Sequence, residues 1–98
     1  MKSKARLEFD SYVLDSLMGD LVGHDRRPSA FLVYLTILTA NSRGVRDLSY
    51  AQLAESTGLS RRSAQDAVTH LITRRLLRSE RSSATETTHY TALTPWRR

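Results

Sequence analysis

The chain has 98 residues, which is enough for one folded domain and short for two. Hydrophobic residues make up 40% and charged residues 26%, proportions typical of globular proteins. There is no cysteine, which excludes a disulfide framework, a thiol nucleophile and thiolate zinc sites. No long apolar stretch follows the basic N-terminus, so we expect a cytoplasmic protein with neither a signal peptide nor a transmembrane segment.

The formal net charge of +5 is unevenly distributed along the chain. Residues 1–27 carry five basic and five acidic side chains, whereas residues 28–98 carry ten basic and five acidic ones, and all ten are arginines. The planar guanidinium donates two parallel hydrogen bonds, which suits phosphate groups and guanine. The excess of arginine therefore indicates a polyanionic partner, with a solvated charged surface as the alternative.

The pattern over residues 9–22 predicts an amphipathic helix that Asp10 or Ser11 could cap. Apolar residues recur every four positions in one stripe, and a second apolar stripe lies beside it. The first stripe holds Phe9, Val13, Leu17 and Leu21, and the second holds Leu14, Met18 and Val22. We expect this helix either to pack on the next helix or to form the surface of a homodimer.

A second helix is expected over residues 28–41, starting at Pro28, where proline costs no hydrogen bond. Its sequence is apolar nearly all round, which is typical of a central, buried helix, so Phe31 and Tyr34 are candidate core residues. Gly44 suits the left-handed turn that would follow, and residues 45–48 could form a short strand.

Two short helices follow, with strong local signals at their ends. Ser49 and Gln52 fit a capping box, in which each side chain accepts a hydrogen bond from the other residue's backbone amide. Gly58 should end this helix, and Ser60 should cap a third helix that runs to about Arg74. The core face of the third helix is predicted to hold Ala64, Ala67, Val68 and Leu71.

The last part of the chain alternates like a β-hairpin. Residues 76–81 and 87–93 are the candidate strands, residues 82–86 would form the tip, and Tyr90 would point into the core. Trp96 lies beyond the hairpin and could pack on the domain or on a partner.

Residues 48–71, LSYAQLAESTGLSRRSAQDAVTHL, closely resemble the helix-turn-helix of bacterial winged-helix proteins. With the hairpin after them, residues 28–94 resemble regulators of the MarR and GntR types and the winged-helix heads of plasmid and phage replication proteins. The fold this implies is mainly α with a small β-hairpin wing: one domain over residues 1–98, with the helix-turn-helix over about 49–75 and the wing over about 76–94. Arg75 stands where these families commonly carry glycine, so we expect the turn into the wing to differ.

The resemblance implies that the third helix reads double-stranded DNA in the major groove. On a helical wheel its exposed face holds Arg, Gln and Thr, side chains that pair with guanine, adenine and the thymine methyl group respectively. Asp66 fits this face poorly, because a carboxylate repels phosphate. It could accept a hydrogen bond from a cytosine amine, but we expect it to pair with Arg62 at the i, i+4 spacing. The candidate DNA-binding residues are Ser60, Arg61, Arg62, Ser63, Gln65 and Thr69, with Arg78 and Arg81 of the wing on the backbone phosphates.

Nothing in the sequence indicates an enzyme, a cofactor or a small-molecule pocket. His24, His70 and His89 are far apart and no pair of them has metal-ligand spacing, so we expect no metal site. Glu8, Asp10, Asp15 and Asp20 are interpreted as the polar side of the first helix.

Transcriptional control by a DNA-binding dimer is the function that the sequence favours. A replication or partition accessory protein of a plasmid or phage is one alternative. A winged-helix module that binds protein and never touches DNA is another.

Overall fold

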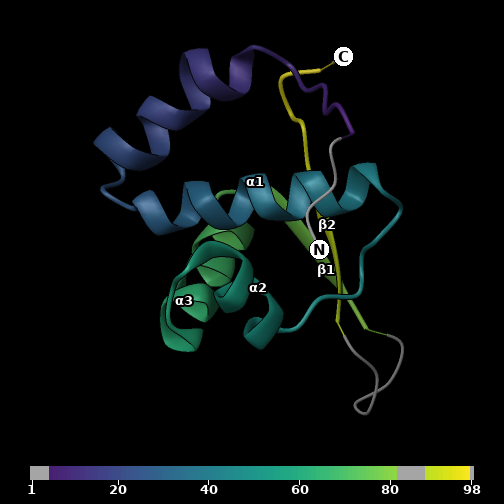
Figure 1. The fold of residues 1–98 in the computed structure, drawn as a ribbon. Helices are drawn as coiled ribbons and strands as arrows, with labels where there is room; N and C mark the ends of the chain where they lie inside the picture. Colours follow the sequence, from purple (N-terminus) through teal and green to yellow (C-terminus); the bar gives the residue numbers. More distant parts are fainter. Residues whose placement is uncertain (1–4, 82–87, 98) are drawn as a thin grey trace.

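The computed structural model describes residues 5–81 and 88–97. The elements in chain order are η1 (Val13–Leu17), η2 (Asp20–His24), α1 (Pro28–Ser42), α2 (Tyr50–Thr57), α3 (Arg61–Thr73), β1 (Leu77–Glu80) and β2 (His89–Ala92). The molecule is thus mainly helical with one small antiparallel hairpin, as the coarse fold prediction stated (Figure 1). The expected hairpin tip, residues 82–86, lies outside the described residues.

The N-terminal helix comprises η1 and η2, two π-helical segments joined by a short α-helical stretch, rather than the regular helix expected over residues 9–22. Val13, Leu17 and Leu21 are all buried. Residues four apart drift one way around a 3.6-residue α-helix and the other way around the wider π turns, with bonds from i to i+5, so the mixture of both keeps these residues on one side. Neither Asp10 nor Ser11 caps this helix. The residue before η1 is Tyr12, and no side-chain cap bond forms there.

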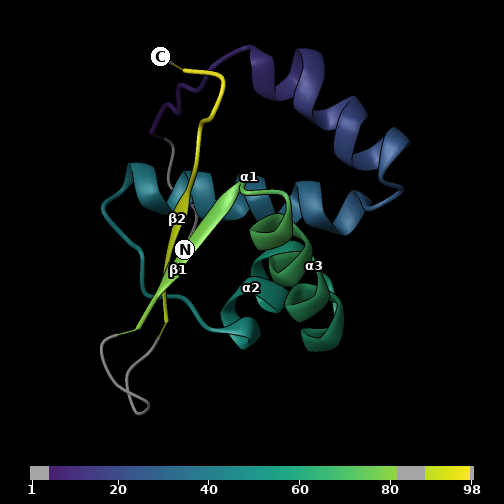
Figure 2. The same ribbon diagram turned by 180° about the vertical axis from the view of Figure 1, so that it is seen from behind.

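Helix α1 is the central helix, as its apolar sequence predicted. Figures 1 and 2 show the N-terminal helix on one side of α1 and the α2–α3 pair on the other. Phe31, Tyr34 and Ile37 are buried in the core that these elements share. The N-terminal helix therefore packs on α1, which is one of the two uses expected for it.

The predicted ends of α2 and α3 are confirmed. Ser49 and Gln52 form the capping box, with bonds of 3.1 and 2.8 Å, and Gly58 ends α2 at a φ of 80°. Ser60 caps α3 by accepting the Ser63 amide at 3.0 Å. The four predicted core residues of α3 are all buried.

The turn from α3 into the hairpin is left-handed at Arg75, whose φ is 58°. The amide of Leu76 donates to the Leu71 carbonyl and that of Arg75 to the Ile72 carbonyl, at 2.9 and 3.0 Å. These two bonds define a Schellman motif. An arginine thus adopts the backbone conformation that glycine adopts most easily.

The hairpin pairs β1 with β2 in the register Leu77 with Ala92 to Glu80 with His89. The other edge of β2 meets the 45–48 segment, where the prediction of a short strand is wrong. The strand is reduced to a single bridge between Asp47 and His89, because the next backbone groups of β2 along this edge bond to the Asn41 side chain instead. On that side the Asn41 amide donates to the Tyr90 carbonyl at 3.0 Å, and its oxygen accepts from the Ala92 amide at 2.8 Å.

The end of the chain packs on its beginning. The Trp96 ring stacks on Tyr12 with a centroid distance of 4.6 Å, and its indole N–H donates to Asp10 at 2.7 Å. Arg97 also binds Asp10, and hydrogen bonds from Arg97 and Trp96 lower the pKa of this carboxyl below its usual value. Of the two contacts considered for Trp96, the one with its own domain is therefore observed.

Candidate nucleic-acid interface

The outward face of α3 carries the residues that the sequence singled out. Arg61, Arg62, Gln65 and Thr69 are exposed, while the opposite face of the helix is buried against α1 and α2. The amphipathic spacing brings the four side chains to one side of the helix, so they can meet a partner together.

The two serines at the start of α3 have a structural task. The Ser60 hydroxyl accepts the Ser63 amide and lies 3.0 Å from the Ser63 hydroxyl, so each serine completes the cap of the other. This cap fixes the first turn, which carries Arg61 and Arg62. The N-terminal end of α3 also bears the positive end of the helix dipole, which favours anions.

Arg61 and Arg62 differ in their electrostatic state. Arg62 lies 3.4 Å from Asp66, the i, i+4 pairing that was expected, with both side chains mostly in solvent. Such exposed pairs contribute little energy, so the pairing leaves Arg62 able to change partner. Arg61 has no carboxylate within ion-pair distance in residues 5–81 and 88–97.

A groove of about 540 Å³ separates α3 from the hairpin. Arg61, Thr69 and Ile72 line it from α3, and Glu80 and Arg81 from the hairpin side. Arg78 projects from β1 and is paired with Glu80 at 3.4 Å, so Arg81 is the less neutralised of the two predicted wing arginines. The structure thus brings Arg61, Thr69 and Arg81 to one groove, whereas Arg78 is paired with Glu80.

A second groove, of about 430 Å³, runs along the other side of α3. Its α3 side is lined by Asp66, Thr69, His70 and Thr73, and it is also lined by Arg27, the residue before α1. Arg27 was not among the predicted site residues. The sequence signal for it is the Arg26–Arg27 pair directly before Pro28.

Beside this groove lies an ionic cluster that sequence reasoning also missed. Asp25 accepts hydrogen bonds from His24, His70 and Arg74, and Arg74 also binds Asp20 at 2.5 Å. Burial alone would raise the pKa of Asp25, but these three bonds outweigh it and lower the pKa to about 2. His24 and His70, expected to be unrelated, thus share one carboxylate, and Asp20 is a cross-fold partner rather than part of a plain polar face.

Comparisons of the chain with family models, with curated proteins and with solved structures found no match. Within the part of the chain that the structure describes, no helix is both long and apolar enough to span a membrane. The exposed face of the N-terminal helix presents Leu14, Met18 and Val22, each about 40–50% exposed.

Proposed function

We propose that this chain is a winged helix-turn-helix domain that binds double-stranded DNA, with α3 as the recognition helix and the β1–β2 hairpin as the wing. The observation that carries the proposal is the outward face of α3. It combines a capped N-terminus, an arginine with no acidic partner in the described residues, and Gln65 and Thr69 on the same ridge. In helix-turn-helix proteins the N-terminal part of the recognition helix reaches the base edges.

The proposed contacts fall into two kinds. Arg61, Arg62 and Gln65 would read bases, with the Thr69 methyl group available to thymine, since the Thr69 hydroxyl already bonds the Gln65 carbonyl at 3.1 Å. Arg81 across one groove and Arg27 across the other would hold the phosphates on either side of α3. Ser60 and Ser63 support the first turn rather than read the sequence.

The role proposed for this binding is transcriptional control by a dimer. A single module of this size offers few base contacts, and a two-fold dimer matches palindromic half-sites. The exposed stripe of Leu14, Met18 and Val22 is the surface proposed to join the two copies, because its companion stripe is already used against α1.

The test is a selection of duplex fragments from genomic DNA, followed by fluorescence anisotropy on the selected duplex at several salt concentrations. Wild-type binding should fall steeply with salt, with a slope of roughly −0.9 per phosphate neutralised. The double variant R61A/R62A should lose about 10- to 100-fold or more in affinity for the selected site, since each base contact is worth roughly 1–3 kcal/mol. Its melting temperature should stay near that of the wild type, because both side chains are exposed.

The matched control is Arg43→Ala, which removes one exposed arginine at the end of α1 farther from α3 (Figure 1). It should change binding only slightly. If the wild-type protein retains no duplex in a salt-dependent manner, the DNA proposal fails and the protein-binding module becomes the better interpretation. If R43A weakens binding as much as the double variant does, general charge rather than the α3 face carries the binding.

A further inference from the structure

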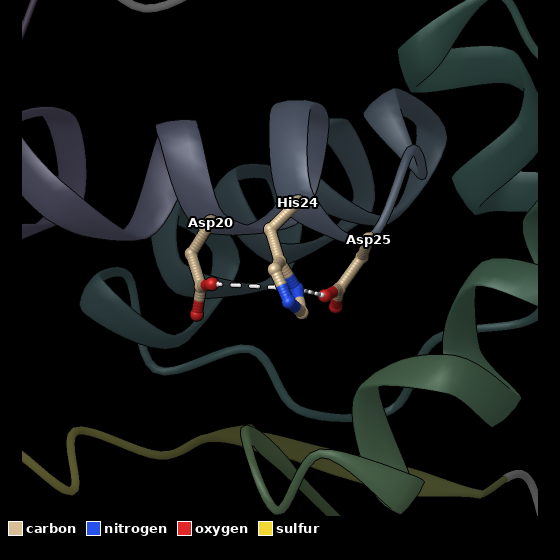
Figure 3. A group of neighbouring side chains, drawn as sticks. All are labelled: Asp20, His24 and Asp25. Carbon is tan, nitrogen blue, oxygen red and sulfur yellow. Dashed lines mark hydrogen bonds and ion pairs between the residues drawn. The ribbon is translucent and has the colours of Figure 1, made fainter.

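The end of the N-terminal helix gathers three side chains with metal-ligating atoms. Asp20, His24 and Asp25 each offer one such atom, and these atoms lie within 4.8 Å of one another. Figure 3 shows the imidazole of His24 between the two carboxylates. The set mixes nitrogen and oxygen donors, and it lies at the C-terminal end of a helix, where the negative end of the helix dipole favours cations.

The oxygens of the two carboxylates are divided between two sides. The Oδ1 atoms of Asp20 and Asp25 face His24 Nδ1, at 3.9 and 2.8 Å. The Oδ2 atom of each carboxylate is bonded to Arg74, the C-cap residue of α3, and that of Asp25 is also 2.8 Å from His70 Nε2. One oxygen of each carboxylate is therefore held from behind by α3, while the other points toward the imidazole.

We propose that Asp20 Oδ1, His24 Nδ1 and Asp25 Oδ1 bind one divalent first-row transition-metal ion, such as Zn²⁺ or Co²⁺. With bonds of about 2.0–2.2 Å, ligand atoms around one ion lie roughly 3–4.4 Å apart, so only small side-chain movements are needed. Arg74 and His70 would act as outer partners that orient the carboxylates, an arrangement common around protein metal ions. Three protein ligands leave at least one coordination position for water.

The choice of ion follows from the donors and the charge. An imidazole nitrogen with two carboxylates suits zinc, cobalt and related ions better than Mg²⁺ or Ca²⁺, which prefer oxygen alone. Two carboxylates and one guanidinium leave a net charge of −1 before the ion binds, so a dication is accommodated. His24 Nδ1 lies 2.8 Å from Asp25 Oδ1, and a bound ion would replace this direct contact by a bond from each of the two atoms to the metal.

Metal binding would tie the N-terminal helix to α3, because the outer partners Arg74 and His70 belong to the end of α3. The site does not depend on DNA binding by α3, and its test contains no DNA. The opposing interpretation is that Arg74 alone satisfies both carboxylates and the cluster is an ion-pair network.

The experiment uses the untagged full chain after treatment with a chelator. Calorimetric titration with Zn²⁺ should give one equivalent of binding, and Co²⁺ should give d–d absorption bands that reach their limit at the same stoichiometry. At a metal concentration a hundred times the measured Kd, the melting temperature should rise by the order of 10 °C. Mg²⁺ at the same concentration should leave it unchanged.

The decisive variant is His24→Ala, because this side chain is 81% exposed and, among residues 5–81 and 88–97, its polar contacts are with the two carboxylates. Without metal it should melt slightly below the wild type, because one exposed bond to Asp25 is lost, and its affinity for Zn²⁺ should fall at least 10-fold. Asp20→Asn should also bind at least 10-fold more weakly, and the matched control His89→Ala, at an exposed histidine on β2, should bind normally. Absence of any melting shift with Zn²⁺, or equal binding by H24A and wild type, would overturn the proposal in favour of the ion-pair network.

Discussion

Arg75, in the turn between α3 and β1, has a left-handed backbone conformation, so replacing it tests directly whether the backbone is strained there. Arg75 has a φ of 58°, a region that costs a residue with a Cβ atom roughly 1–2 kcal/mol and costs glycine nothing. Its side chain is exposed and has no carboxylate within ion-pair distance in the described part of the chain. Replacing it by glycine should therefore relieve the strain and remove no contact that stabilises the fold.

The expected gain can be worked out from two opposing effects. Relief of the strain stabilises the fold by roughly 1–2 kcal/mol, while glycine makes the unfolded chain more flexible and costs about 0.4–1 kcal/mol. The net increase in the free energy of unfolding should be about 0.5–1 kcal/mol. In a domain of this size, that raises the melting temperature by roughly 2–8 °C.

The assay is denaturant unfolding followed by circular dichroism, with two control variants. Arg75→Ala removes the same charge but keeps the Cβ atom, so it should give none of the gain. Arg43→Gly places glycine at a residue whose φ is −99°, where no strain is relieved, and should destabilise the fold. If R75G is less stable than R75A, the turn is not strained and the reasoning is refuted.

Three further predictions concern the N-terminal helix. Asp25 has a folded-state pKa of about 2, below its usual 3.8. Its ionised carboxylate therefore adds about 2 kcal/mol to the free energy of unfolding above pH 4, and this stabilisation is lost as the pH falls from about 4 to 2. Asp25→Ala should flatten the acid limb of the curve of stability against pH. Leu17→Ala should lower the free energy of unfolding by about 2–5 kcal/mol in urea titration, because Leu17 is buried, and a loss below 1 kcal/mol would mean that the helix is not packed as described. Met18→Lys, one residue further on, should leave the stability unchanged yet shift the proposed dimer to monomer in sedimentation; an unchanged sedimentation profile would rule out that surface.

What the sequence predicted well are the features set by neighbours in the chain. A capping box depends on two residues three positions apart, so Ser49 and Gln52 could be identified without any tertiary information. The same holds for the turn at Gly58, whose left-handed φ only glycine adopts cheaply. The buried face of α3 follows from helical periodicity, which also places Arg61 and Gln65 on the exposed side.

What it could not predict depends on pairs far apart in the chain. The contact between His70 and Asp25 spans 45 residues, and the contact between Trp96 and Asp10 spans 86. No periodic pattern relates such residues, because they meet only when the elements that carry them pack around α1. The one local clue at the cluster was the i, i+4 spacing of Asp20 and His24, which places both on one helix face.

The position of the ionic cluster gives the N-terminal helix a second role beside packing. Arg74 and His70 lie at the C-terminal end of α3. Asp25, whose side chain is only 7% exposed, binds both of them. Three residues after the last contact of this cluster the chain enters β1, through the strained residue Arg75. A change at Asp25 would therefore act on both elements proposed to meet DNA, the helix and the hairpin, although Asp25 itself belongs to neither. This is the physical reason to expect that mutations in the N-terminal helix alter the proposed DNA binding by α3 as well as the stability of the fold.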